Sequence, residues 1–297
     1  RLAAVRATAA VGDDTTLKRI RELLHDTQAD PQTRLAALSG LARRNHSELG
    51  NDLQRLINEG QLTTAALQAA SAINDPDFAE KVVARYSKFA KADRNAVIDF
   101  LVARKAGARL LVSAIEQKQI PATDVSAGQA RQIAALGDAA LLKRLDKVWG
   151  TVRRSSADRL RQIKAWEKKL DPSRIGAADL ASGREIFRKT CSSCHKLFGD
   201  GRTIGPELTG ANRRNLHYLI SNVVDPSAAV PADFRLATIV TTNGRVITGA
   251  ITQRSEAGLT VQTATESIQI GKDDVETVKV SSKSMMPDGL LDKLEQD

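Results

Sequence analysis

The sequence has 297 residues, is 42% hydrophobic and 27% charged, and carries a formal net charge of +9. This length is enough for one large or two ordinary domains, each with its own core. There is no apolar run of about 18 residues and no charged-then-apolar opening, so we expect neither a transmembrane helix nor a signal peptide within these residues. Because the first residue is Arg1 rather than Met, we expect a processed protein or a fragment.

The positive charge is concentrated in the first part of the chain. Residues 1–175 contain 30 Lys or Arg and 20 Asp or Glu, whereas residues 176–297 contain 14 and 15. A basic region of this kind could meet nucleic acid, an anionic lipid surface or an acidic protein. The basic residues are spread over many predicted helices without interleaved aromatic residues, so the pattern favours a solvated surface and we expect no nucleic-acid partner.

Residues 1 to about 170 show Ala- and Leu-rich periodicity typical of helices. The sequence Arg-Leu-Ala-Ala-Val at 1–5 recurs as Arg-Leu-Ala-Ala-Leu at 34–38. Small-residue helices are predicted at 65–74, 94–104 and 127–136, and more polar helices at 16–25, 49–58, 78–88, 109–119 and 139–148. Two helices in about 30 residues are typical of an α-solenoid, and the units resemble degenerate HEAT repeats. An irregular helical bundle is the alternative.

A predicted domain boundary follows these helices. A charged helix is predicted over 152–170, and the residues from Asp171-Pro172 to Gly176 interrupt it, since the residue before a proline avoids the helical conformation and glycine is conformationally loose. We therefore predict helical repeats at 1–150, a charged helix and linker at 151–175, and a second domain at 176–297.

The second domain opens with a cysteine motif. Cys191 and Cys194 are the only cysteines in the chain, and His195 follows them directly. This spacing is the attachment motif for c-type haem, in which both thiols bind the haem edge and the histidine becomes the proximal iron ligand. A structural zinc site needs four ligands, and a thioredoxin-like pair should follow a strand in a βαβ unit. The motif predicts one covalently attached haem c.

The second iron ligand can be sought among few residues. Met285 and Met286 are the only methionines, and they stand immediately before Pro287. A thioether is a soft ligand that favours ferrous iron and would leave no open coordination position for a substrate. We predict Met286 as the distal ligand in preference to Met285, with His217 as a further alternative. The competing interpretation of any single methionine is that it fills a core.

Two further features between these ligands point to the haem. The carbonyl of Pro206 is predicted to accept the Nδ1 proton of His195, since a proximal histidine needs such an acceptor to fix its tautomer. Arg213 and Arg214 are the nearest basic pair after this turn, and we predict that one or both contact a haem propionate, because a guanidinium matches a carboxylate. A solvated helix start is the alternative for the two arginines.

Strand signals follow a helix predicted at about 212–224. Segments at 236–242, 245–253, 259–263, 267–270 and 275–280 read as antiparallel strands, and Asn243-Gly244 is a hairpin-turn signal between the first two. We predict a small sheet or barrel inserted at about 234–280.

The motifs together resemble a known family. Gly183 and Phe187, the cysteine motif, Gly205-Pro206-x-Leu208 and Met286-Pro287 look like a class I cytochrome c. Residues 179–294 resemble the haem-binding domain of large Planctomycetes and Verrucomicrobia proteins, through Cys-x-x-Cys-His, Gly-Pro-x-Leu-Thr-Gly, Asp-Pro-Ser, Asn-Gly-Arg-Val-x-x-Gly and Ser-x-Met-Pro in that order. Such domains are often fused to HEAT-like repeats and to a dehydrogenase-like β-propeller.

The resemblance implies a mainly α fold: a HEAT-like α-solenoid, then an α-helical cytochrome c domain with a small antiparallel insertion. In class I cytochromes c, a proline carbonyl binds the proximal histidine, and a glycine and aromatic face of the first helix packs on a C-terminal helix. Here only eleven residues follow Met286, so we expect that helix to be short or absent, which leaves the partner of Gly183 and Phe187 open.

The implied function is single-electron transfer by a module without catalytic residues of its own, or by part of a larger dehydrogenase. The expected partners are a dehydrogenase as donor and a cytochrome or terminal oxidase as acceptor. The alternatives are a haem enzyme or a peroxide or gas sensor with a displaceable distal ligand, and a HEAT-repeat scaffold with an accessory haem. Because export-side machinery attaches haem c, we expect a periplasmic or otherwise exported protein, with membrane association through a segment outside this sequence as a further option.

Overall fold

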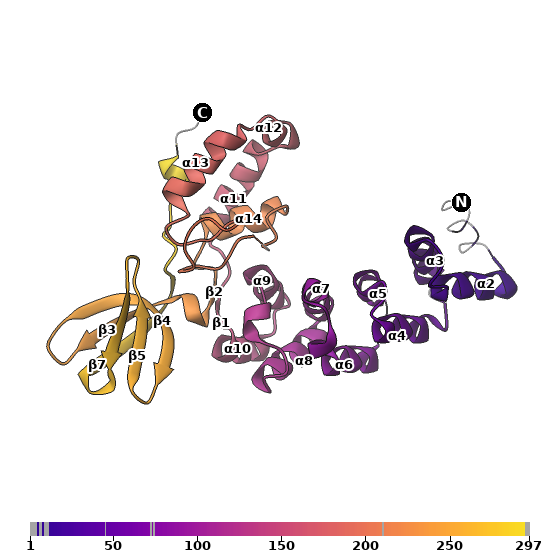
Figure 1. Ribbon diagram of the computed structural model, residues 1–297, viewed down its shortest axis with the longest axis horizontal. Coiled ribbons are helices and arrows are strands. Elements are labelled where there is room, and N and C mark those ends of the chain that lie inside the picture. The colour runs from indigo at the N-terminus through magenta and orange to yellow at the C-terminus, as the bar shows by residue number, and fades with distance from the viewer. Residues whose placement is uncertain are drawn as a thin grey trace. The chain divides into compact units, whose positions relative to one another are not determined.

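The computed structural model describes residues 5, 8, 12–44, 46–71, 73, 75–209 and 211–294 (Figure 1). The chain divides into two compact units, Arg1–Arg144 and Leu145–Asp297. Apart from Val5, the first copy of the repeated five-residue sequence lies outside the described residues. None of the helices within the described ranges combines the length and the apolar character that crossing a membrane requires.

The first unit is a succession of short helices whose ends follow local sequence signals. Asp13 and Asp75 cap two of them with their carboxylates, Ser126 forms a capping box with Gln129, and Gly60 ends another in the left-handed conformation. The helices are α2 (Asp14–His25), α3 (Pro31–Arg44), α4 (Leu49–Glu59), α5 (Thr63–Ala70), α6 (Pro76–Ala84), η1 (Tyr86–Lys88), α7 (Lys91–Val102), α8 (Lys105–Glu116), η2 (Ala122–Asp124), α9 (Ala127–Ala135) and α10 (Ala139–Val148), the last of which continues into the second unit.

The helices of the first unit form two layers. In one layer α3 contacts α5, α5 contacts α7 and α7 contacts α9, and in the other α4 contacts α6 and α6 contacts α8 (Figure 1). Fully buried alanines such as Ala36, Ala66 and Ala130 lie in the first layer, and large side chains such as Leu53 and Leu111 fill the interior from the second. The helices predicted to be rich in small residues thus lie in the first layer, and helices predicted to be more polar lie in the second.

Several side-chain hydrogen bonds in the first unit join residues about 30 positions apart. Arg21 binds Asp52, at a sequence separation of 31, and the Gln129 amide donates to Asp99, at a separation of 30. Similar bonds link Arg34 to Gln61, Thr64 to Asp93, Arg109 to Asp138 and Arg144 to Glu116. Each bond joins a helix to the next helix in the same layer, or to the residues directly before that helix. The repeat length predicted from the sequence is therefore also the spacing of these hydrogen bonds.

Some predicted helix boundaries were wrong. The helix expected at 65–74 ends at Ala70, and the one expected at 78–88 is divided into α6 and η1. The charged helix expected from residue 152 is α11 (Ala157–Lys169), because the Ser156 side chain caps it and the preceding residues form a strand. The helix expected from about residue 212 is α14 (Leu216–Val224), which begins only after the Asn215 cap.

After the end of α10, the first strand of the second unit pairs with a distant segment. β1 (Gly150–Val152) is antiparallel to β2 (Ala229–Pro231), and α11 packs against α14 through a cluster of Ile163, Ile220 and Val224. The interval 151–175, expected as a charged helix and linker, therefore contacts later segments of this unit. Its remaining helices are α12 (Pro172–Gly176), α13 (Leu180–Thr190), and the short η3 (Ala232–Phe234), η4 (Lys272–Asp274) and η5 (Leu291–Lys293).

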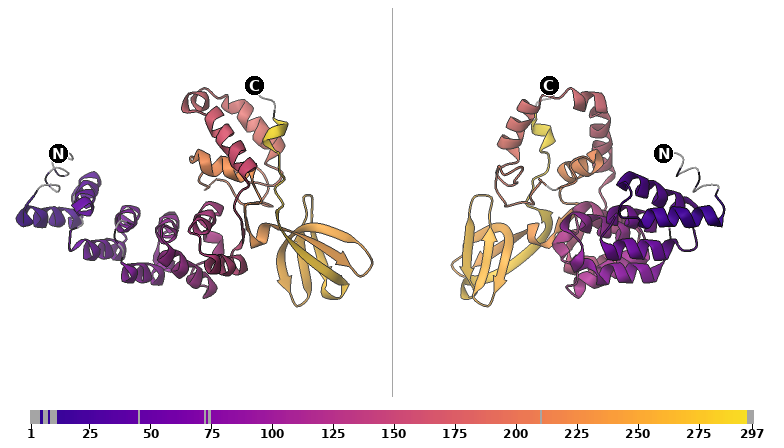
Figure 2. Two further views of the ribbon diagram at one scale, coloured as in Figure 1. Left: turned by 180° about the vertical axis from the view of Figure 1, so that it is seen from behind. Right: turned by 45° about the vertical axis from the view of Figure 1, so that its right-hand side comes forward.

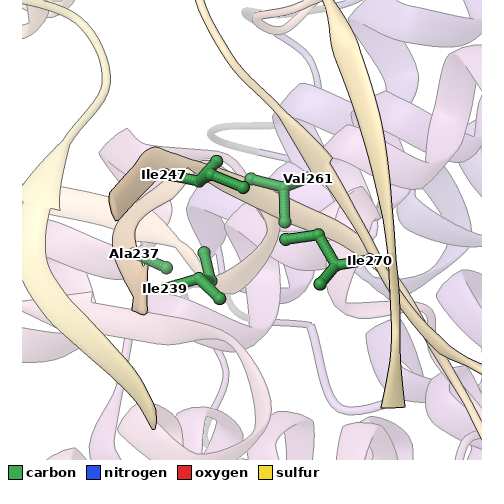
Figure 3. Close-up of a cluster of buried hydrophobic side chains, with 5 residues drawn as sticks. All are labelled: Ala237, Ile239, Ile247, Val261 and Ile270. Carbon is green, nitrogen blue, oxygen red and sulfur yellow. The ribbon is translucent and has the colours of Figure 1, made fainter. Parts of the chain in front are cut away.

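A five-stranded antiparallel sheet follows, as the strand pattern predicts. Its strands are β3 (Arg235–Thr241), β4 (Val246–Ser255), β5 (Gly258–Gln262), β6 (Ser267–Gly271) and β7 (Val275–Ser284). Their order is β6-β5-β4-β3-β7, and both views in Figure 2 show them as one curved sheet. One face packs around Ala237, Ile239, Ile247, Val261 and Ile270 (Figure 3). β7 runs past the predicted end at 280 and stops directly before Met285.

Candidate haem-attachment site

The cysteine motif lies on the turn that ends α13. Asp179 caps the start of this helix, and the hydrogen bond from the Ser182 hydroxyl, with that from the Ala181 amide, lowers the pKa of its carboxyl. At the other end, the amides of Cys194 and His195 donate to the carbonyl of Cys191, at 3.1 and 2.9 Å. One tight turn therefore brings both thiols and the imidazole together.

Burial of the Cys191 thiol disfavours its thiolate form. Cys191 and Cys194 are half-buried and free, and burial, with a smaller effect of the neighbouring Cys194, raises the pKa of the Cys191 thiol. Cysteines that catalyse disulfide exchange have a lowered pKa, since the thiolate is their reactive form. The raised pKa of Cys191 does not favour thiol exchange, and neither cysteine is in a disulfide.

A glycine-containing loop wraps around this turn. Its amides donate to the carbonyls of the motif: Arg202 to Ser192 at 2.9 Å, and Gly205 to Cys194 at 2.7 Å. The loop reverses at Gly199 and Gly201, where φ is +94° and +97°, values that favour glycine. A Cβ at Gly201 would also collide with the carbonyl oxygen of His195. The loop thus fixes the backbone that carries the proximal histidine.

The imidazole of His195 is held by two consecutive residues of the loop. Its Nδ1 lies 2.8 Å from the carbonyl oxygen of Pro206, the contact expected from the sequence. A Cβ added at Gly205 would lie 2.6 Å from Cε1 of the ring, so any larger residue would displace the imidazole. When Nδ1 donates to Pro206, Nε2 carries a free lone pair for a metal. Sequence reasoning identified the acceptor but missed the steric role of Gly205.

The apolar surface around the motif fits a haem. From residue 164 to 219, the described residues include no buried side chain, whereas Leu180 is 83%, Phe198 66% and Ile186 44% exposed. A Cβ built at Gly183 would have no atom within 4 Å. Two thiols, an oriented imidazole and exposed apolar side chains close to them in the sequence are features that fit a covalently attached haem.

The two arginines differ in their surroundings. Arg213 donates from Nε to the Leu208 carbonyl at 2.7 Å and from Nη2 to the Thr209 carbonyl at 3.1 Å, and its guanidinium lies 4.7 Å from the centre of the Phe198 ring. It therefore braces the loop, a role that sequence reasoning missed. Arg214 is exposed. Contact of either with a propionate stays a prediction.

The methionines lie at the end of the sheet. Met285 and Met286 are half-buried, and the Met286 amide donates to the Ser284 hydroxyl at 3.1 Å. His217, the alternative ligand, has its Nδ1 2.6 Å from a Glu167 carboxylate oxygen and its Nε2 3.5 Å from the Ser221 hydroxyl. To bind iron, His217 would have to give up one of these two partners, the Ser221 hydroxyl for ligation through Nε2 or the Glu167 carboxylate for ligation through Nδ1. The role of Met286 as a ligand stays a prediction.

Comparison with known families supports this description of the site. Residues 180–233 match the family model for cytochrome c, which covers α13, the cysteine motif, the loop and α14. No curated protein matches the chain. The chain therefore contains a cytochrome c-like domain, a type of domain that carries covalently bound haem c and transfers electrons.

Proposed function

We propose that this chain is a monohaem c-type cytochrome module that passes single electrons between protein partners. The observation that carries the proposal is the contact of His195 Nδ1 with the Pro206 carbonyl, beside the two thiols and within the cytochrome c match. A bound haem supplies the iron that accepts and releases one electron. The protein attaches it, orients its proximal ligand and excludes other ligands.

Each residue of the site has a separate task in this proposal. Cys191 and Cys194 form the thioether bonds, and His195 binds iron through Nε2. The Pro206 carbonyl keeps the proton on Nδ1 and makes the imidazole a stronger ligand. Met286 would provide the second protein ligand to the iron, which would raise the reduction potential and leave no position for peroxide or a gas.

The proposal also covers the domain type, the helical repeats, the cellular compartment and the redox partners. The order of the motifs, including those outside the cytochrome c match, supports the haem-binding domain type of large Planctomycetes and Verrucomicrobia proteins. The two helix layers with a contact period of about 30 residues support a HEAT-like solenoid in the first unit. We therefore propose an exported, periplasmic protein that takes electrons from a dehydrogenase and gives them to a cytochrome or oxidase.

Covalent attachment is the first property to test. The full chain with Cys191→Ala and Cys194→Ala, expressed with haem-attachment machinery, is expected to lose haem staining after denaturing electrophoresis. Ser193→Ala is the matched control, because Ser193 lies in the same turn but has no thiol that could bind haem. This variant should stain as the wild type does. Persistent stain at full chain mass in the double variant would sink the proposal.

A further inference from the structure

The short segment Met285-Met286-Pro287, here called the methionine loop, is held by residues far away in the sequence. On the basis of the proposed function, we infer that Ser227 is a positioning residue for the distal ligand. The Ser284 amide donates to the Ser227 hydroxyl at 3.2 Å, and the Ser284 hydroxyl in turn accepts from the Met286 amide at 3.1 Å. Two hydrogen bonds therefore connect Ser227 to the backbone of the proposed ligand.

Ser227 itself stands on a rigid turn. Asp225, two residues earlier, is only 1% exposed and accepts hydrogen bonds from Nη2 and Nη1 of Arg153, at 2.6 and 3.1 Å. The Arg153 amide donates to the Ala228 carbonyl at 2.8 Å, next to the pairing of β1 with β2. A buried carboxylate that lost this partner would be strongly destabilising, so the turn keeps its position. The Asp-Pro-Ser motif thus connects β1 to the methionine loop.

The other end of the loop has anchors of unequal strength. Arg159 of α11 lies 3.3 Å from Asp288, but the Asp288 side chain is 58% exposed, and ion pairs at the surface contribute little. Leu291 packs against the cluster of Ile163, Ile220 and Val224, which gives the firmer hold. The methionine loop is therefore fixed before and after its two methionines.

Fixing the loop affects how well it binds iron. A soft thioether binds ferric iron weakly, so an external ligand competes with it whenever the loop opens. A loop held in place by the chain has less freedom to lose on ligation, and it closes more often. Loss of the Ser227 hydroxyl should accordingly favour the open state without affecting the thioether bonds at Cys191 and Cys194.

The test uses the full haem-loaded chain in the ferric state with azide as the probe. Ser227→Ala is expected to bind azide about two- to tenfold more tightly than the wild type, the range that one lost hydrogen bond represents, and to weaken the far-red thioether band. Ser227→Thr keeps the hydroxyl and should restore both. Met286→Ala gives the limit of a fully open site, and haem staining should be unchanged in all of these variants.

Ser255→Ala is the matched control, since the Ser255 hydroxyl donates to the nearby Gly258 carbonyl at the turn between β4 and β5. Azide affinity and the far-red band unchanged in Ser227→Ala would overturn the inference, as would an equal change in Ser255→Ala. A wild-type protein without the thioether band would overturn the methionine ligand itself. That failure is visible before any substitution and is thus distinct from failure of the Ser227 contact.

Discussion

The first unit and the segment around α13 are both rich in helix, but their apolar side chains have different surroundings. In the first unit, Leu24, Leu41 and Leu53 are 0% exposed and contact other helices. In the α13 segment, Leu180 is 83% and Ile186 44% exposed although the helix is amphipathic. Neighbouring helices cover the apolar side chains in the first unit, whereas in the α13 segment we expect the haem to cover them. We expect the first unit to be stable alone and the α13 segment to be ordered mainly by its haem.

The largest expected effect comes from a matched pair of leucines. Leu53→Ala in α4 should lower the free energy of unfolding of the first unit by about 2–5 kcal/mol, because it opens a cavity in a packed interior. In the chain without haem, Leu180→Ala in α13 should change the free energy of unfolding of the second unit by less than about 0.5 kcal/mol. Urea unfolding followed by circular dichroism measures both. Equal losses would show that α13 has a core of its own and would break the comparison.

A smaller effect is expected from one contact in the haem-attachment site. Gly205→Ala would push a methyl group into the His195 ring and should cost about 1–3 kcal/mol of local packing. Haem should still attach, but the low-spin spectrum should be lost or mixed with a high-spin form. Gly176→Ala is the control, because a Cβ there would meet nothing within 4 Å. A normal spectrum in Gly205→Ala would show that the ring has room to shift.

The smallest effect is a pH dependence confined to the first unit. Burial, reinforced by the hydrogen bond to Asp124, raises the pKa of Tyr86 well above its ordinary value of 10.0. The folded state therefore holds this proton more tightly than the unfolded state, and the resulting stability is present at neutral pH and is lost as the pH rises above about 10. Tyr86→Phe should reduce the fall in urea midpoint between pH 8 and pH 10.5. A fall of the same size in both proteins would contradict the assignment.

Local signals made much of this fold predictable from sequence. The helix alternation, the Asn243-Gly244 turn and the cysteine motif all depend on residues close together in the chain, and the contact of His195 with Pro206 spans only a short loop. The pairing of β1 with β2, the packing of α11 on α14 and the bond of Ser227 to Ser284 join distant segments. Periodicity contains no information about such pairings, so the interval 151–175 looked like a linker.

The junction between β7 and the methionine loop has a consequence for insertions and deletions. β7 ends at Ser284, so its length determines where the next residues begin. Each strand residue adds about 3.3 Å and reverses the direction of the side chain. β7 pairs regularly with β3 from Thr277 to Val280, so deleting a single residue there would shift the register and carry Met286 away from its place. An added residue in the β4 to β5 turn would leave Met286 where it is. Among homologous chains, length variation should accordingly collect in that turn and be rare in β7.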